Sequence, residues 1–265
     1  VKMVQKGVEQ AFGPSFRQVM RRSQAKLSAT VFGALLAAVM QSSMAVAIMV
    51  SGFYSASIIS FELGLAAMLG ADVGSALVIL FLSLDITWLA PLMLVVGGLL
   101  FLKSETPTIK QIGRMVIGVA LILIALGLIR ANVSPLRNSS FLPDFTLMLE
   151  RDFLATFLIG ALLALLLHSS VAAVLMFVAL VASETLPLMV GVSLVLGANL
   201  GSSLLPLWMT RAMPPTARQL PLMNLLIRGG AALSMVLIVN RTPLIGLLPE
   251  VHMGQQLILT HIIFN

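Results

Sequence analysis

The chain repeats a polar triplet inside apolar sequence, and this duplication restricts its fold more than any other feature. Gln-Ser-Ser at 41–43 lies in one apolar run, and His-Ser-Ser at 168–170 lies in another. A glycine motif, Gly-Ala-Asp-Val-Gly-Ser at 70–75, recurs as Gly-Ala-Asn-Leu-Gly-Ser at 197–202. Both pairs are offset by the same 127 residues.

The offset holds along a longer stretch. Residues 28–78, aligned with 155–205, are identical at 16 of 51 positions. A sequence rich in Leu and Ala matches itself by chance, but chance does not place two distinct motifs at one common offset. We therefore predict an internal duplication.

The composition indicates the environment in which this duplicated chain folds. Hydrophobic residues make up 59% of the chain and charged residues 10%, with a mean hydropathy of +1.06. Apolar stretches of about 20 residues predict a polytopic helical membrane protein in contact with the lipid bilayer. The formal net charge of +6 is then explained by basic loops on one membrane face, so a nucleic-acid partner is not expected.

Four segments are expected. Residues 1–26 have apolar positions at helical spacing among basic ones, which predicts an amphipathic interfacial helix on the cytoplasmic face; a helix packed on a partner domain is the alternative. Repeat 1 is expected over 27–130, an extracytoplasmic loop over 131–152 and repeat 2 over 153–265. The chain begins with Val and stops inside an apolar segment, so we expect truncation at both ends.

Residues 27–56 form either one long span or a re-entrant hairpin, and loop charges favour the hairpin. With residues 1–26 inside, the hairpin leaves Lys103, Lys110 and Arg114 inside, as the positive-inside rule requires. Three spans then separate the two copies, which inverts one relative to the other. The expected fold class is an all-α polytopic membrane protein with two inverted repeats, each with a re-entrant helical hairpin and an interrupted transmembrane helix.

Helix breaks at membrane depth are typical of secondary transporters. A break has free N–H groups at one half-helix and free carbonyls at the other, so it can hold an anion and cations together. Such backbone is stable in a membrane only where it is buried in protein or lines a cavity. The two Ser-Ser tips are the expected places, and we expect them to meet.

The four motif copies resemble the doubled Gln-Ser-Ser-Ser and Gly-Ala-Asn-Ile-Gly-Thr signatures of the type II sodium/phosphate cotransporters. The closing Thr-His-Ile-Ile-Phe-Asn at 260–265 is similar to that family's His-x-x-Phe-Asn element. The resemblance spans essentially the whole chain. In the bacterial branch a cytoplasmic PhoU-like helical domain often follows the membrane part, which makes such a domain an expected partner and the inner membrane the expected location.

The resemblance implies alternating-access symport of sodium with inorganic phosphate, with no cofactor beyond the coupling ion. It implies phosphate binding by the triplet serines and sodium binding by polar side chains of both motifs, and hydroxyl and amide groups suit both ions. To the phosphate ligands we add an arginine that lies near the centre of an apolar segment. The expected phosphate ligands are Ser42, Ser43, Ser169, Ser170 and Arg228, and the expected sodium ligands are Gln41, Asp72, Ser75, Asn199 and Ser202.

Several residues depart from the family pattern. The third serine of each triplet is replaced, by Met44 and Val171, so two hydroxyls are missing. The second copy has His168 in place of Gln, and this side chain could couple transport to protons because its charge changes near neutral pH. The first copy has Asp72 in place of Asn, which would strengthen a cation site.

Each motif also has a purely structural interpretation. Serine in an apolar helix often bonds back to a carbonyl one turn earlier, and Gly-x-x-x-Gly most often marks close helix packing. Arg228 lies near the centre of an apolar segment, where a charge is costly. It could serve phosphate, pair with Asp72, or reach water if Arg228-Gly229-Gly230 breaks the helix. We expect His261 and Asn265 to act in packing or behind the direct ligands.

Three functions remain open at this point. Sodium-coupled phosphate symport leads, and the second is export of phosphate, or transport of another oxyanion, with coupling to sodium or to protons. The third is a membrane anchor or sensor for a further C-terminal domain. We do not expect an enzyme, because no constellation of side chains resembles a hydrolytic site.

Overall fold

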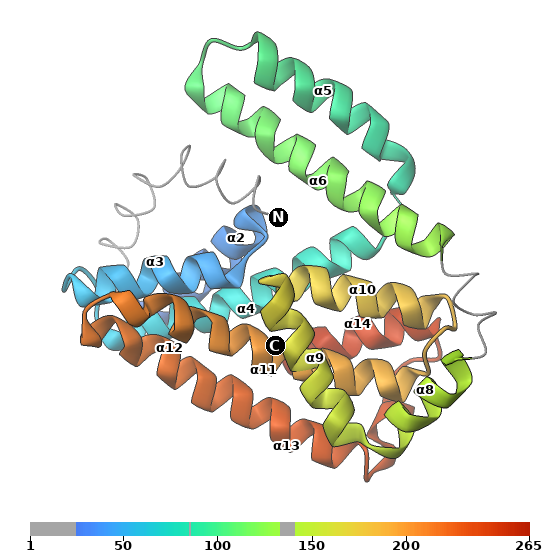
Figure 1. Ribbon diagram of the computed structural model, residues 1–265. Coiled ribbons are helices and arrows are strands. Elements are labelled where there is room, and N and C mark those ends of the chain that lie inside the picture. The colour runs from blue at the N-terminus through green and yellow to red at the C-terminus, as the bar shows by residue number, and fades with distance from the viewer. Residues whose placement is uncertain (1–24, 85, 133–140) are drawn as a thin grey trace. The chain divides into compact units, whose positions relative to one another are not determined.

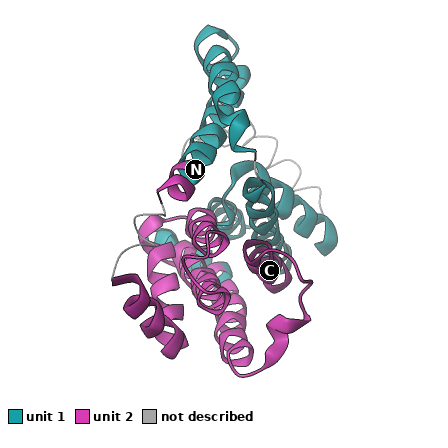
Figure 2. Cartoon of the chain, turned by 90° about the vertical axis from the view of Figure 1, so that its right-hand side faces the viewer, with its two compact units in different colours: residues 1–127, 209–220 teal, residues 128–208, 221–265 magenta. Residues whose placement is uncertain are grey.

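The computed structural model describes residues 25–84, 86–132 and 141–265, and every regular element in these ranges is helical (Figure 1). The chain divides into two units, residues 1–127 with 209–220 and residues 128–208 with 221–265 (Figure 2). The expected amphipathic helix at 1–26 lies almost wholly outside the described residues.

The first unit carries the first copy of each motif. Its helices are α2 (Lys26–Met40), α3 (Ser43–Ser55), α4 (Phe61–Ser83), the 3-10 turn η1 (Thr87–Leu89), α5 (Ala90–Lys103) and most of α6 (Pro107–Ala131). The connecting turns η2 (Thr210–Ala212) and η3 (Pro215–Arg218) also belong to it. Tyr54 at the end of α3 donates its hydroxyl to Gln219 Oε1 (2.6 Å), which attaches this connector to the first copy.

The second unit carries the second copy. It contains α8 (Phe141–Arg151), α9 (Phe153–Leu167), α10 (Ser170–Ala182), most of α11 (Leu188–Met209), the end of α12 (Gln219–Asn224), the π-helical turn η4 (Leu225–Gly229), α13 (Gly230–Val239), the 3-10 turn η5 (Pro243–Leu247) and α14 (Met253–Phe264). Helix α8 lies within the segment 131–152, which we expected to be a loop.

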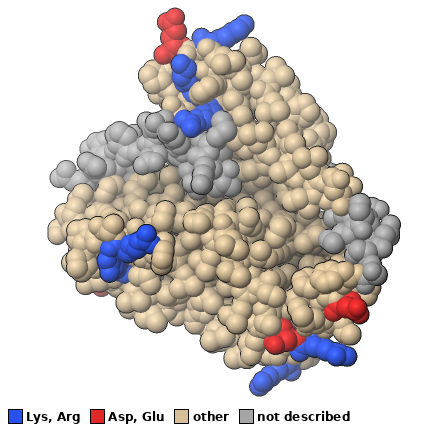
Figure 3. All heavy atoms as spheres, in the orientation of Figure 1, with Lys and Arg blue, Asp and Glu red and all other residues tan. Residues whose placement is uncertain are grey.

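Four helical stretches are long and apolar enough to cross a membrane: Phe61–Ser83, Pro107–Ala131, Leu188–Ala212 and Pro215–Val239. On the face drawn in Figure 3, most of the surface carries neither acidic nor basic side chains. The chain is therefore an all-helical multi-pass membrane protein, as predicted.

Each triplet breaks a helix in the same way. Helix α2 ends where Gln41 adopts a left-handed conformation (φ 51°), and the extended Ser42 (φ −161°) then caps α3. Helix α9 ends at the left-handed His168 (φ 50°), and the extended Ser169 (φ −159°) caps α10. The 127-residue duplication is thus present in the backbone conformation as well as in the sequence.

The far ends of α3 and α10 repeat each other too. Ser57 (φ 55°) and Glu184 (φ 56°) are again 127 residues apart, and both are left-handed. Ser57 N–H donates to the Tyr54 carbonyl and Ile58 N–H donates to the Phe53 carbonyl, which is the hydrogen-bond pattern of a Schellman motif. Together with the two triplet positions, these are the only non-glycine residues with positive φ in the described ranges.

Ser57 offers a test of this backbone conformation away from any expected site. A left-handed conformation costs a residue with a Cβ roughly 1 kcal/mol that glycine avoids. We expect Ser57→Gly to raise the free energy of unfolding in detergent by about that amount, whereas Ser57→Ala, which keeps the Cβ, should not. Equal stability of the two variants would contradict the assigned φ.

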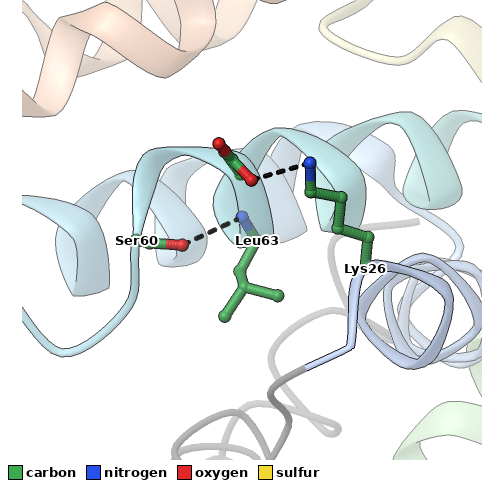
Figure 4. A network of polar contacts seen from close by, with 4 residues as sticks. Lys26, Ser60 and Leu63 are labelled. Carbon is green, nitrogen blue, oxygen red and sulfur yellow. Dashed lines mark hydrogen bonds and ion pairs between the residues drawn. The ribbon is translucent and has the colours of Figure 1, made fainter.

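Helices α2 and α4 run side by side in the same direction. A Cβ added at Gly70 would meet the Thr30 carbonyl, and one added at Gly74 would meet the Ala34 carbonyl, so the two backbones are in direct contact. At the start of the pair, Lys26 Nζ lies 2.7 Å from Glu62 Oε2, next to the Ser60 hydroxyl that accepts from Leu63 N–H and caps α4 (Figure 4). This ion pair is exposed and adds little stability.

The parallel arrangement of α2 and α4 makes α2 and α3 a helical hairpin, because α3 has to return from the end of α2 to the start of α4. The second copy has the same contacts, since Cβ atoms at Gly197 and Gly201 would meet the carbonyls of Phe157 and Ala161 in α9. Figure 1 shows α9 and α10 diverging from the turn that joins them. Close packing, the structural interpretation of Gly-x-x-x-Gly, is therefore correct for both copies.

Candidate substrate and ion sites

The first triplet is buried at the tip of the α2–α3 hairpin. Gln41 is 7% exposed, and its Oε1 accepts no hydrogen bond from any residue that the structure describes. Ser42 Oγ accepts from Ala45 N–H (3.2 Å), and Ser43 is the first residue of α3. This bond uses the oxygen of Ser42 but not its hydroxyl hydrogen, and the first turn of any helix has N–H groups without intrahelical acceptors. The tip thus combines anion-binding donors with one buried amide oxygen.

The second triplet repeats the capping bond in a more exposed setting. Ser169 Oγ accepts from Ala172 N–H (3.2 Å), while Ser169 and Ser170 are each partly buried. His168 is exposed, and its Nδ1 lies 3.1 Å from the Leu166 carbonyl oxygen. Neither Ser42 nor Ser169 bonds back to a carbonyl of its own helix; each instead starts a new helix.

The polar residues of the glycine motifs lie inside unbroken helices. In α4, Ser75 Oγ donates to the Asp72 carbonyl (2.8 Å), and in α11, Ser202 Oγ donates to the Asn199 carbonyl (2.9 Å). All four residues are buried. The helix break in each copy therefore occurs at the triplet. The serine of each glycine motif instead donates its hydroxyl back to a carbonyl of its own helix.

Arg228 is the most heavily engaged of the predicted ligands. It is 5% exposed, and its Nη2 donates to Asn199 Oδ1 (2.5 Å) and to Asn265 Oδ1 (2.6 Å). The alternative in which this side chain escapes to water is wrong. The backbone around it is not broken at Gly229 either; it widens into the π-helical turn η4, a feature frequent at functional sites.

His261 completes this cluster from α14. Its Nδ1 lies 3.3 Å from Asn199 Nδ2 and 3.2 Å from Asn265 Nδ2. Amide nitrogens only donate, so Nδ1 accepts and the ring proton is on Nε2. His261 is 1% exposed. The sequence predicted that His261 and Asn265 act in packing or behind the direct ligands. Only the packing of α11, η4 and α14 reveals that both contact Asn199 and that Asn265 also contacts Arg228.

These features define a class of protein. The fold is that of a multi-pass helical membrane protein with a duplicated core, and its candidate ligands include the polar residues of two helix breaks and of a buried cluster around one arginine. The model of the Na+/Pi-cotransporter family matches residues 1–131 and 142–256. The chain belongs to this family, whose name describes a transporter and not an enzyme.

Relatives support the same assignment. The chain is 35% identical over 266 residues to the "Putative inorganic phosphate export protein YjbB" of Salmonella typhimurium, covering 99% of this chain and 49% of the relative. The protein of the same name from Escherichia coli strain K12 is 37% identical, over 85% of this chain and 42% of its own length. The "Uncharacterized protein YqeW" of Bacillus subtilis is 25% identical, over 76% and 66% of the two chains. The chain thus spans about half the length of the YjbB relatives, and no solved structure matches it.

Proposed function

We propose that this protein moves inorganic phosphate across the membrane by alternating access, with sodium as the coupling ion. The observation that carries the proposal is the pair of serine-capped helix breaks, which share one backbone geometry in a chain of the Na+/Pi-cotransporter family. Such breaks present donors to an anion in an otherwise apolar segment.

The proposal includes the membrane arrangement. Helices α2 and α9 have 15 residues and α3 and α10 have 13, all fewer than the ~20 that a membrane span needs. Each hairpin therefore enters and leaves on one side, and the two copies are inverted. The positive-inside rule places the basic N-terminal segment in the cytoplasm, and the family's bacterial branch favours the inner membrane and a PhoU-like domain as partner.

In this proposal each copy supplies phosphate ligands of its own. Ser42, Ser43, Ser169 and Ser170 donate hydroxyl hydrogens, the N-terminal amides of α3 and α10 add backbone donors, and Arg228 supplies a positive charge. The dipoles of these two helices favour an anion at the same ends.

Sodium is assigned first to the first copy. Gln41 Oε1 is a buried oxygen with no donor among the described residues, and Asp72 and Ser75 are buried in α4. Hard cations take carboxylate, amide and hydroxyl oxygens as ligands. By the duplication, Asn199 and Ser202 are the corresponding residues in the second copy, and His168 replaces Gln41 there.

The coupling ion is tested by phosphate flux. Purified protein in proteoliposomes should accumulate radiolabelled phosphate under an imposed sodium gradient and not under a matched potassium gradient. Flux that follows pH and ignores sodium would replace sodium with protons and direct attention to His168. No flux under either gradient would favour an anchor or sensor.

Removing one hydroxyl from each tip tests the phosphate ligands. A hydrogen bond to a charged group contributes about 1.5–3 kcal/mol, so Ser43→Ala and Ser170→Ala should each weaken phosphate binding roughly tenfold or more. Neither serine caps its helix, so thermal stability should change little. Isothermal titration with phosphate measures the effect, and parent-like affinity in both variants would exclude these serines as ligands.

Export is the second candidate, and the names of two relatives at 35% and 37% identity favour it. The same architecture serves either direction, because the imposed gradients decide net flux. Phosphate-loaded cells lacking other phosphate carriers would distinguish the two: faster efflux on expression of the protein indicates export, and faster uptake indicates import.

A further inference from the structure

Two amide oxygens in the second unit converge on a single cationic nitrogen. Asn199 Oδ1 in α11 and Asn265 Oδ1 beyond α14 lie 2.5 Å and 2.6 Å from Arg228 Nη2. Nη2 of a guanidinium has two N–H groups, enough to donate one hydrogen to each of these oxygens. Two amide oxygens therefore contact this cationic nitrogen, as oxygen ligands contact a metal cation.

The orientation of both amides is held by their own helices. Asn199 Nδ2 donates to the Val195 carbonyl (2.8 Å), and Asn265 Nδ2 donates to the His261 carbonyl (2.7 Å). Both amide nitrogens also face His261 Nδ1. Neither amide can turn its nitrogen toward Arg228 without losing these bonds, so two oxygens are preorganised for a cation at that point.

We propose that the Arg228 guanidinium is a tethered cation that occupies the cation position of the second copy. Amide oxygens are ligands of hard metal cations, and here Nη2 lies where those oxygens would hold sodium. Asn199 is accordingly a ligand of Arg228 and not of sodium. The proposal deepens the proposed function, since it identifies which copy binds the coupling ion.

The difference between the copies agrees with this assignment. Asn199 corresponds to Asp72 by the 127-residue offset, so the copy that contains Arg228 has the neutral side chain. In the first copy, α5 follows the glycine-motif helix and contains no charged residue before Lys103. The π-helical turn η4 holds Arg228 and Gly229 inside while Leu226 and Ile227 are 62% and 42% exposed, and so it places the guanidinium at Asn199.

The experiment measures sodium binding directly. Equilibrium binding of radiolabelled sodium to the purified full-length protein in detergent, with potassium chloride as the balancing salt, gives the number of sodium ions per chain. Arg228→Ala should bind one more sodium per chain than the parent. Arg228→Lys, which retains a cation at this helix position, should bind the parent number.

The additional ion should depend on the amide oxygens. Adding Asn265→Ala to Arg228→Ala should remove the extra sodium, and the stability of Arg228→Ala should rise with sodium but not with potassium. No additional sodium in a folded Arg228→Ala variant would overturn the proposal.

A second variant applies if Arg228→Ala does not fold. Asn199→Asp keeps Arg228 and introduces the acid of the first copy, so its carboxylate should pair with the guanidinium and leave sodium affinity unchanged. Sodium affinity raised tenfold or more would identify residue 199 as a sodium ligand and refute a tethered cation. If the parent protein binds no sodium, sodium coupling is rejected but the tethered cation is not. In that case Arg228→Ala should still bind one sodium ion more than the parent.

Discussion

Alanine in place of Gly70 or Gly197 is expected to destabilise the protein by about 3 kcal/mol, because overpacking at a site that cannot relax forces two helices apart. The added Cβ would collide with the Thr30 carbonyl in one copy and with the Phe157 carbonyl in the other. Backbone atoms cannot rotate away as the end of a flexible side chain can. In Gly70→Ala the contact between α2 and α4 would have to widen, and in Gly197→Ala the contact between α9 and α11 would have to widen.

The matched control is Gly98→Ala. A Cβ at Gly98 meets nothing within 4 Å, and alanine is the better helix former, so this variant should be as stable as the parent or slightly more stable. Thermal unfolding of the three purified variants in detergent compares them. Equal melting temperatures for Gly70→Ala and Gly98→Ala would show that α2 and α4 do not cross at Gly70.

Arg228→Ala is expected to abolish most phosphate transport. A hydrogen bond between charged groups contributes about 1.5–3 kcal/mol, so loss of the guanidinium should weaken phosphate binding by roughly 10- to 100-fold. The amide oxygens of Asn199 and Asn265 would lose the donor they share. The same variant is expected to gain a sodium ion, so the loss of phosphate flux and the gain of sodium binding test different roles of one side chain.

Arg241→Ala is the control for that loss. Arg241 lies in the turn just after the end of α13 and is exposed, so its removal should leave flux near the parent value. Flux per folded protein, measured in proteoliposomes, is the readout. Equal flux in both variants would exclude Arg228 from phosphate transport.

Local sequence chemistry predicted much of what the structure has. The triplets were expected at helix breaks, and both break helices, because Ser42 and Ser169 cap the helix that follows while Gln41 and His168 accept a left-handed conformation. The apolar stretches predicted membrane-spanning helices, and four helices are long and apolar enough to be such spans. Helix α8 was missed, because its sequence between Phe141 and Arg151 is too polar and too short to stand out as a span.

The environment of Arg228 could not be predicted in the same way. Its two amide partners lie 29 and 37 residues away in sequence, on elements that meet only when the second unit packs. The sequence identified a charge in an apolar segment and allowed three explanations for it. The burial of Arg228 excludes the explanation in which its side chain reaches water. Its hydrogen bonds to Asn199 and Asn265 are contacts that the sequence did not predict.

The amino-acid sequence by itself determined the duplication, the membrane helices and the position of each helix break, because these depend on apolar periodicity and on capping between residues a few positions apart. The tertiary structure alone decided that glycine motifs bring α2 against α4 and α9 against α11, and that Asn199, Asn265 and His261 gather at Arg228. Contacts of this kind depend on which helix faces meet, and that is set by the packing of many side chains together, so no short stretch of sequence contains it.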